Sequence, residues 1–319
     1  MHSYTLLVTA DPNAKFLNPF DPFRADTRIF VSKDRAELRE QAPHADIILG
    51  ADFDDPQLLQ DTFPYATRAR WVHSLFAGVE HILSPAIVRS SVPLTNGRGA
   101  SCTALGEWVL AAMLHFAYDL RRLQRNQLAE RWEHSDVEGL QGRTLGLIGH
   151  GAIGRAVAER ARPFGMRILA LRRRPDSSTQ DPLIDATYST SMIGEMLGQC
   201  DCGAVAVPLT LETRQMIAAE QIAAMKPSAV IINVGRGSVL DEAALVRALD
   251  SGKIRGAALD VFETEPLPAG HPLYHLGNVL LSPHSADHTP GWLERGMECF
   301  LDNFARFRSG EPLQNLVDK

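Results

Sequence analysis

One short segment near the middle of the chain restricts its fold more than any other: Gly149-His150-Gly151-Ala152-Ile153-Gly154. An apolar stretch at 144–149 predicts a buried strand, and an amphipathic stretch at 152–162 predicts a helix directly after it. The pattern G-x-G-x-x-G between a strand and a helix is typical of a turn that holds a dinucleotide pyrophosphate at the positive end of the helix. A tight turn that binds no ligand is the alternative.

Strand-like and helix-like segments alternate along most of the chain, which predicts parallel sheets with helices on both faces. Amphipathic stretches at 34–41 and 241–250 predict two of the helices, with Asp241 as an N-cap, and a last helix is predicted at 290–308. A long helical pattern at 101–123 divides the chain, and the alternation occurs before and after it. The predicted strands besides 144–149 are 5–8, 46–50, 70–73, 166–171, 204–207, 229–233 and 256–260.

Length and charge limit the architecture and the partners. The 319 residues indicate about two domains. The net charge of −6 argues against nucleic acid or anionic membranes as partners. Apolar stretches are far shorter than the ~20 residues of a membrane span. The N-terminus shows no signal-peptide pattern, so we expect a cytoplasmic protein with four reduced cysteines.

Three arginines, Arg172, Arg173 and Arg174, follow the strand predicted at 166–171. Sites specific for NAD usually carry an acidic residue here, which binds the ribose 2′-hydroxyl. Guanidinium groups suit a 2′-phosphate better, because they combine a permanent charge with a planar set of donors. We therefore predict that Arg172 and Arg173 bind NADP(H), with NAD(H) as the alternative cofactor. A solvated basic loop is the alternative for the arginines themselves.

Three later segments carry an arginine, a glutamate and a histidine, and loops beyond the carboxyl ends of parallel strands line a common crevice. Arg236 follows the strand predicted at 229–233, Glu265 follows the one at 256–260, and His284 follows Ser282-Pro283. Reduction of a keto acid requires a hydride at carbon and a proton at oxygen. A histidine can supply that proton near neutral pH, a carboxylate can orient its ring, and a guanidinium can bind the substrate carboxylate.

These segments resemble the D-isomer-specific 2-hydroxyacid dehydrogenases, most closely the glyoxylate/hydroxypyruvate reductases. The resemblance implies two Rossmann-like doubly wound parallel-sheet domains, with a discontinuous substrate domain at 1–97 and 287–319 and a dinucleotide-binding domain at 98–286. It implies a small 2-keto acid or D-2-hydroxy acid as substrate. His284 is then the general acid/base, Glu265 is its partner and Arg236 binds the substrate.

The resemblance also implies further ligand contacts and an assembly. For the cofactor these are Gly149, His150, Gly151, Ala152, Ile153, Gly154, Thr103, Pro208, Val234 and Asp260, the last at the nicotinamide carboxamide. The substrate contacts are Phe76, Ala77, Gly78 and Val79, whose segment resembles the family's carboxylate-binding loop. The long helical region at 101–132 is where the family forms a homodimer, and Trp132 stands where some members send a Trp into the neighbouring active site.

Some residues depart from the family pattern, and other functions stay open. Gly106 replaces the usual Ala before Glu107, and 205–210 lacks a His that many members carry. His284 and His288 with Asp287 resemble metal ligands, but no further partner stands at a suitable spacing, so we expect no metal site. A dinucleotide-sensing protein of the corepressor type, with a relic active site, is the alternative function.

Overall fold

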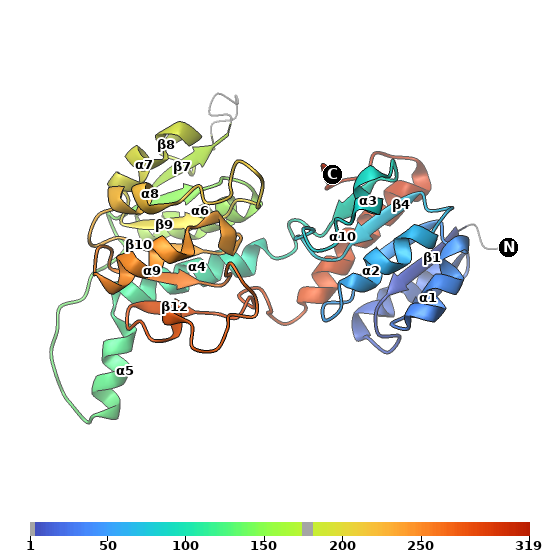
Figure 1. Ribbon diagram of the computed structural model, residues 1–319. Coiled ribbons are helices and arrows are strands. Elements are labelled where there is room, and N and C mark those ends of the chain that lie inside the picture. The colour runs from blue at the N-terminus through green and yellow to red at the C-terminus, as the bar shows by residue number, and fades with distance from the viewer. Residues whose placement is uncertain (1–3, 174–180) are drawn as a thin grey trace. The chain divides into compact units, whose positions relative to one another are not determined.

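The computed structural model describes residues 4–173 and 181–319, and the chain divides into two compact units (Figure 1). The first unit is Met1–Ser101 with Pro290–Lys319, and the second is Cys102–Thr289. The first unit therefore combines both ends of the chain. None of the described helices is both long and apolar enough to cross a bilayer.

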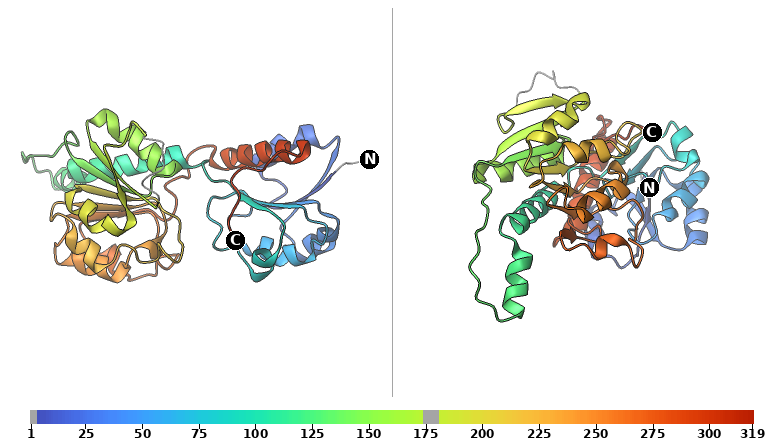
Figure 2. Two further views of the ribbon diagram at one scale, coloured as in Figure 1. Left: turned by 90° about the horizontal axis from the view of Figure 1, so that it is seen from above. Right: turned by 60° about the vertical axis from the view of Figure 1, so that its left-hand side comes forward.

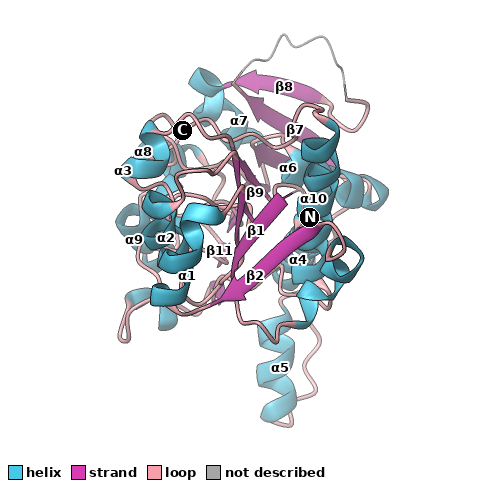
Figure 3. Ribbon diagram, turned by 90° about the vertical axis from the view of Figure 1, so that its right-hand side faces the viewer, coloured by secondary structure: helices cyan, strands magenta, loops and turns pink. Residues whose placement is uncertain are grey.

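The first unit is a parallel five-stranded sheet in the order β2-β1-β3-β4-β5. Its strands β1 and β2 lie side by side (Figure 3). Successive residues of a strand face opposite sides of the sheet. Leu6, Ile47 and Trp71 pack against the long C-terminal helix, while Leu7 and Ile48 face the opposite layer of short helices. The elements are β1 Tyr4–Thr9, β2 Thr27–Ser32, α1 Arg35–Gln41, β3 Ile47–Gly50, α2 Gln57–Thr62, β4 Trp71–Ser74, α3 Pro85–Arg89, β5 Leu94–Asn96 and α10 Trp292–Ser309.

The second unit is a parallel seven-stranded sheet in the order β12-β11-β10-β9-β6-β7-β8, with helices on both faces (Figure 2). One face is covered by α4 and α6, and the other by α7, α8 and α9. The elements are α4 Cys102–Ala117, α5 Leu120–Leu128, β6 Thr144–Ile148, α6 Ala152–Ala161, β7 Arg167–Arg172, β8 Ala186–Ser189, α7 Ile193–Gln199, β9 Cys202–Val205, α8 Ala219–Ala224, β10 Val230–Asn233, α9 Glu242–Asp250, β11 Gly256–Leu259 and β12 Val279–Leu281. The predicted α/β fold with two doubly wound parallel sheets is confirmed.

The helical region predicted as continuous at 101–123 is two helices. The chain bends at Asp119, whose φ of 46° lies in the left-handed region. The Asp119 side chain accepts a hydrogen bond from the Arg122 N–H and so caps α5. As a result α5 projects from the body of the second unit (Figure 1). Gly106 fits where α4 meets α6, because a Cβ there would lie 3.0 Å from the Ala156 carbonyl oxygen.

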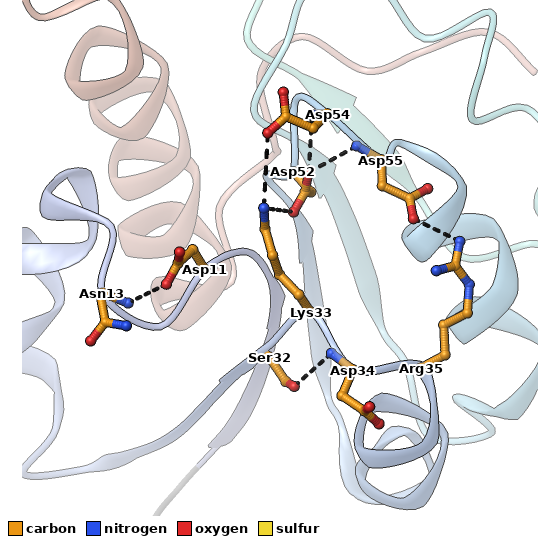
Figure 4. Close-up of polar contacts among 9 residues, drawn as sticks. All are labelled: Asp11, Asn13, Ser32, Lys33, Asp34, Arg35, Asp52, Asp54 and Asp55. Atoms are coloured by element: carbon orange, nitrogen blue, oxygen red, sulfur yellow. Dashed lines mark hydrogen bonds and ion pairs between the residues drawn. The ribbon is translucent and has the colours of Figure 1, made fainter.

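Acidic side chains gather beyond the strands of the first unit (Figure 4). Asp52, which is 5% exposed, accepts hydrogen bonds from the Asp54 and Asp55 N–H groups at 3.0 and 2.9 Å. Lys33 pairs with Asp52 at 3.0 Å, and this hydrogen bond raises the pKa of Lys33. The pair balances the buried charge and fixes the turn after β3. Among the described residues no group of three His, Cys, Asp or Glu side chains is placed to bind a metal.

Candidate active site

The predicted site residues of the second unit lie along one edge of its sheet. Because all strands are parallel, the loops after their carboxyl ends follow the strand order. Read from β12 to β6, these loops carry His284, Asp260, Arg236, Pro208 and Gly149, and Arg172 ends the next strand, β7. Residues far apart in the sequence therefore occur in an ordered row, with His284 at one end and Arg172 at the other.

His284 and Glu265 form a hydrogen-bonded pair at the β12 end of this row. The imidazole Nδ1 donates to Glu265 Oε2 at 2.7 Å, and Glu265 Oε1 accepts from the Phe262 N–H at 2.8 Å. The side chains are 47% and 34% exposed. No described residue makes a hydrogen bond to Nε2 of His284, so this nitrogen is available for proton exchange with a ligand.

Both pKa values of this pair shift toward the charged forms. The hydrogen bond to Glu265 raises the pKa of His284, against the weaker opposing effects of burial and the Arg236 charge. Burial by itself raises the pKa of Glu265, but the hydrogen bonds from His284 and Phe262 outweigh it and hold that pKa below its ordinary value. His284 therefore stays protonated to a higher pH than an ordinary histidine.

Asp260 fixes the backbone that presents His284. Its Oδ1 accepts hydrogen bonds from the Ser285 and Ala286 N–H groups at 2.9 and 3.0 Å, and its carbonyl accepts from the His284 N–H at 2.8 Å. Asp260 is 2% exposed. The φ of His284 is +52°, a conformation that side-chain-bearing residues adopt only when their surroundings impose it. These three bonds to Asp260 impose it here.

Arg236 stands in a loop that buried contacts define closely. The amide of Asn233, which is fully buried, donates to the Arg236 carbonyl at 3.0 Å and accepts from the Gly235 N–H at 3.0 Å. Gly237 packs directly on the loop after β11, since a Cβ there would lie 1.8 Å from the carbonyl carbon of Phe262. This contact brings the Arg236 loop beside the segment that leads to Glu265.

The glycine turn has the shape that a dinucleotide requires. Gly149 has a φ of +99°, and a Cβ on it would lie 2.6 Å from the Val207 side chain. Gly154 allows helix α6 to approach the turn, since its Cβ would lie 2.2 Å from the Gly149 carbonyl oxygen. At Gly151 a Cβ would meet nothing within 4 Å. No side chain caps the N-terminus of α6. The open space and the uncapped helix end fit a pyrophosphate group.

His150 connects this turn to the strand that carries the arginines. Its Nδ1 contacts Arg172 Nη2, and its Nε2 lies 3.4 Å from Asp181 Oδ2. Burial and the neighbouring Arg172 charge lower the pKa of His150. The Asp181 carboxylate also pairs with Arg155 on α6. Arg173 is exposed, and Arg174 lies outside the described residues.

The remaining predicted cofactor contacts flank the turn. Val234 is buried and donates its N–H to the Val205 carbonyl at 3.1 Å, whereas Pro208 is exposed beyond β9. Thr103 is exposed in the first turn of α4, and Ala152 and Ile153 form the first turn of α6. All of these residues belong to the second unit.

The predicted substrate loop belongs to the first unit, directly after β4. Phe76, Gly78 and Val79 are half-buried, and Ala77 is exposed. The N–H groups of Ala77, Gly78 and Val79 make no hydrogen bond within residues 4–173 and 181–319. Three neighbouring unpartnered N–H groups can bind an anion.

Trp132 belongs to the segment that follows α5 and is 92% exposed. Its ring lies edge to face with that of His134, with the ring centroids 6.3 Å apart. An indole this exposed is unusual in a folded protein, because its large apolar surface favours burial.

Sequence analysis missed residues that act through long-range contacts. Asp181 places an acidic group beside His150, although no acidic residue stands within 171–175. Asn233 was not singled out as a site residue, yet its amide closes the Arg236 loop. Its position at the end of a buried strand, where a polar side chain requires partners, is a signal that could have singled it out.

Comparison with known proteins gives consistent matches. Residues 110–286 match the family model "D-isomer specific 2-hydroxyacid dehydrogenase, NAD binding domain". The chain is 34% identical over 267 residues to a glyoxylate reductase from Korarchaeum cryptofilum, an alignment covering 81% of this chain and 79% of that protein. It is 32% identical over 302 residues to a D-3-phosphoglycerate dehydrogenase from Methanocaldococcus jannaschii, covering 92% of this chain but only 55% of that longer protein.

A solved structure extends the likeness to the whole chain. An NADPH-dependent glyoxylate/hydroxypyruvate reductase from Sinorhizobium meliloti, in complex with NADP and sulfate, superposes with a TM-score of 0.85 at 26% identity. The match covers 99% of this chain and 98% of that one. The family model covers more than half of the chain, and the resemblance predicted from the motifs is confirmed. The chain is an oxidoreductase that belongs to the D-isomer specific 2-hydroxyacid dehydrogenase family and carries its NAD-binding domain.

Proposed function

We propose that this protein is an NADP(H)-dependent reductase of small 2-keto acids of the glyoxylate or hydroxypyruvate type. The observation that carries the proposal is the His284–Glu265 pair, joined at 2.7 Å, on the same sheet edge as Arg236 and the open glycine turn. The charge of Arg236 acts on both members of the pair. The site thus offers a proton donor, its orienting carboxylate and an anion-binding cation within one row of loops.

The proposed roles follow from this chemistry. Bound NADPH supplies the hydride. Arg236 binds the substrate carboxylate and polarises the carbonyl. The N–H groups of Ala77, Gly78 and Val79, whose segment resembles the family's carboxylate-binding loop, are proposed to bind a carboxylate as well. Protonated His284 donates from Nε2 to the carbonyl oxygen, because Nδ1 is held by Glu265. Glu265 fixes the ring and stabilises its charged form, so the same pair can accept the proton in the reverse reaction.

A panel of 2-keto acids, each assayed with NADPH and with NADH, tests this function. We expect the highest kcat/KM with glyoxylate or hydroxypyruvate, because Arg236 is proposed to bind a carboxylate and the relatives include glyoxylate reductases. Measurable turnover only with large or branched keto acids would contradict the substrate class and leave the reaction type standing.

Arg172 and Arg173 support the cofactor preference. Arg172 ends β7, the strand beside the glycine turn, and contacts His150 within that turn. This is the place where dinucleotide-binding domains meet the adenosine ribose. Asp181 is the nearby acidic group, but Arg155 pairs with it and offsets its charge. The S. meliloti reductase that matches the whole chain is itself NADPH-dependent.

We predict that kcat/KM with NADPH exceeds that with NADH by about tenfold or more, the value of one charge-assisted contact to the 2′-phosphate. Replacing Arg172 and Arg173 together by Ala should raise KM for NADPH and leave kinetics with NADH nearly unchanged. Arg162→Ala, which breaks an ion pair with Asp185 elsewhere in the unit, is the control. Equal wild-type efficiency with both cofactors would show that the two arginines are solvated surface residues.

We also propose that the protein is a homodimer that forms through the projecting segment 118–139. Its exposed apolar side chains are Tyr118, Leu120, Leu123, Leu128, Trp132 and Val137. Apolar surface of this extent on a projecting helix and loop is typical of an interface. We place Trp132 in this interface, directed toward the partner's active site.

Light scattering at micromolar concentration should therefore give twice the chain mass of 35.0 kDa. Leu128→Lys, at a position 86% exposed in the isolated chain, should shift the protein toward monomer, because the charge would be buried on association. Leu211→Lys is the matched control, since Leu211 is 95% exposed outside the segment. A wild-type mass of one chain would contradict the dimer and the role of Trp132.

A further inference from the structure

The substrate loop of the first unit is held by the end of strand β5, on which no role in the reaction has been placed. Asn96, the last residue of β5, is 9% exposed and donates from Nδ2 to the Ala77 carbonyl at 2.6 Å. The next residue, Gly97, donates its N–H to the Phe76 carbonyl at 3.2 Å. Two consecutive carbonyls of the loop are thus fixed from the same side.

Fixing these carbonyls also aims the N–H groups that follow them. A trans peptide is planar, and its C=O and N–H point in opposite directions. The Ala77 carbonyl points to Asn96, so the Gly78 N–H points away from β5. In the same way, the Phe76 carbonyl points to Gly97, and the Ala77 N–H points away. These are two of the three loop N–H groups without a partner in the described part of the chain.

Close packing leaves the loop little freedom to adopt another orientation. A Cβ on Gly97 would lie 2.2 Å from the Leu75 carbonyl oxygen, so only glycine allows this approach of β5 to the loop. On the other side, the Phe76 N–H donates to Ser74 Oγ at 3.3 Å. The loop is therefore held at its beginning by Ser74 and along its carbonyls by residues 96 and 97.

Asn96 is itself fixed by the C-terminal segment. Its N–H donates to the Asn315 carbonyl at 3.3 Å, and its Oδ1 accepts from the Arg98 N–H at 3.3 Å. The Asn315 amide donates to the Arg98 carbonyl at 2.8 Å. The Val317 N–H donates to the Leu94 carbonyl at 2.9 Å, next to a bridge between Thr95 and Leu316. The Asn96 side chain consequently has one orientation, with its NH₂ group on Ala77.

We propose that Asn96 is a positioning residue that aims the Ala77 and Gly78 N–H groups at the carboxylate of the substrate. The inference rests on the proposed function, because the loop is the proposed carboxylate site. Asn96 touches no reacting atom and acts through the peptide groups of residues 76–78. Its removal weakens the binding of the substrate carboxylate in the ground state and in the transition state alike, so its effect falls on KM more than on kcat.

The test is steady-state reduction of glyoxylate by NADPH in the full-length Asn96→Ser variant. Serine keeps an oxygen that can accept from the Arg98 N–H but cannot reach the Ala77 carbonyl. We expect KM for glyoxylate to rise roughly tenfold, kcat to change less than about threefold, and KM for NADPH to stay unchanged. The inhibition constant of oxamate, a carboxylate with the shape of a 2-keto acid, should rise by the same factor as KM.

Ser32→Ala is the control. Ser32 is 3% exposed in the same unit, and its hydroxyl donates to Glu37 Oε2 at 2.6 Å and accepts from the Asp34 N–H at 3.0 Å. The variant therefore loses two hydrogen bonds of a buried side chain that holds neither the loop nor the C-terminal segment. Its kinetic constants should equal those of the wild type, while thermal unfolding followed by circular dichroism should show similar losses in both variants.

The outcomes separate this inference from the proposed function. An active wild type with an unchanged KM for glyoxylate in Asn96→Ser contradicts the positioning role alone. Equal changes in the Ser32 control also contradict it, because the effect would then follow from stability. A wild type that reduces no keto acid contradicts the proposed function and this inference with it. Asn96→Ala is a second variant, for use if Asn96→Ser does not fold. If neither variant folds, Asn96 is a structural residue and the positioning role is contradicted.

Discussion

The His284→Ala variant should lose about 10²-fold or more in kcat for keto-acid reduction, the usual scale for removal of a general acid. The imidazole is the group proposed to give the proton, because Glu265 holds Nδ1 at 2.7 Å and raises the pKa of the ring. Most of the proposed NADPH contacts are on the glycine turn and at Arg172, at the other end of the row of loops, so the affinity for NADPH, measured by fluorescence titration, should change little.

His271→Ala is the control for this substitution. His271 also pairs with a carboxylate in the second unit, with its Nε2 3.3 Å from Glu242 Oε1, but that pair lies outside the proposed chemistry. We expect its kcat to stay within about twofold of the wild type, since partly exposed pairs contribute little. A His284→Ala variant that keeps nearly the wild-type rate would show that another group supplies the proton.

Arg236→Ala should lower kcat/KM for glyoxylate by roughly 10²-fold or more, the scale for removing one preorganised donor from a developing negative charge. Its guanidinium is proposed both to bind the carboxylate and to polarise the carbonyl, so kcat should fall and KM should rise. Arg236→Lys should recover only part of the loss, because an ammonium lacks the planar pair of donors. Stopped-flow measurement of NADPH oxidation separates the two constants.

The Asn233 and Gly237 contacts make this test specific. These contacts fix the backbone around Arg236 and do not involve the Arg236 side chain. Arg236→Ala should therefore fold with a melting temperature close to that of the wild type. A large loss of stability together with the loss of activity would indicate that Arg236 is a structural residue. An unchanged KM for glyoxylate would remove it from the substrate site.

The fold could be predicted because its internal strands are nearly continuous apolar segments, and the helices between them are amphipathic. The strands that sequence analysis did not predict are β2, β5, β8 and β12, and these are the outermost strands of the two sheets. An edge strand pairs on one side only and is often short or polar, as β5 and β8 show with Leu-Thr-Asn and Ala-Thr-Tyr-Ser. An edge segment becomes a strand because it pairs with the adjacent strand of the sheet, and the local sequence does not reveal that pairing.

At the candidate site, too, local motifs could be read from the sequence and long-range contacts could not. The glycine turn and the Arg236, Glu265 and His284 motifs could be proposed as site residues from the sequence, because each stands directly after a strand or an apolar segment. The contacts that hold these residues in place could not be predicted, because they join positions that are far apart in the chain. Asp260 reaches 25 and 26 residues forward to the N–H groups of Ser285 and Ala286, and Asn96 reaches 19 residues back to Ala77.

The most direct test of the account is the absorbance at 340 nm of a mixture of the wild-type protein, NADPH and glyoxylate or hydroxypyruvate. The account predicts a continuous decrease that depends on the keto acid, with one hydroxy acid formed for each NADPH consumed. A stable absorbance with every 2-keto acid tested, from a protein that still binds NADPH, would contradict it.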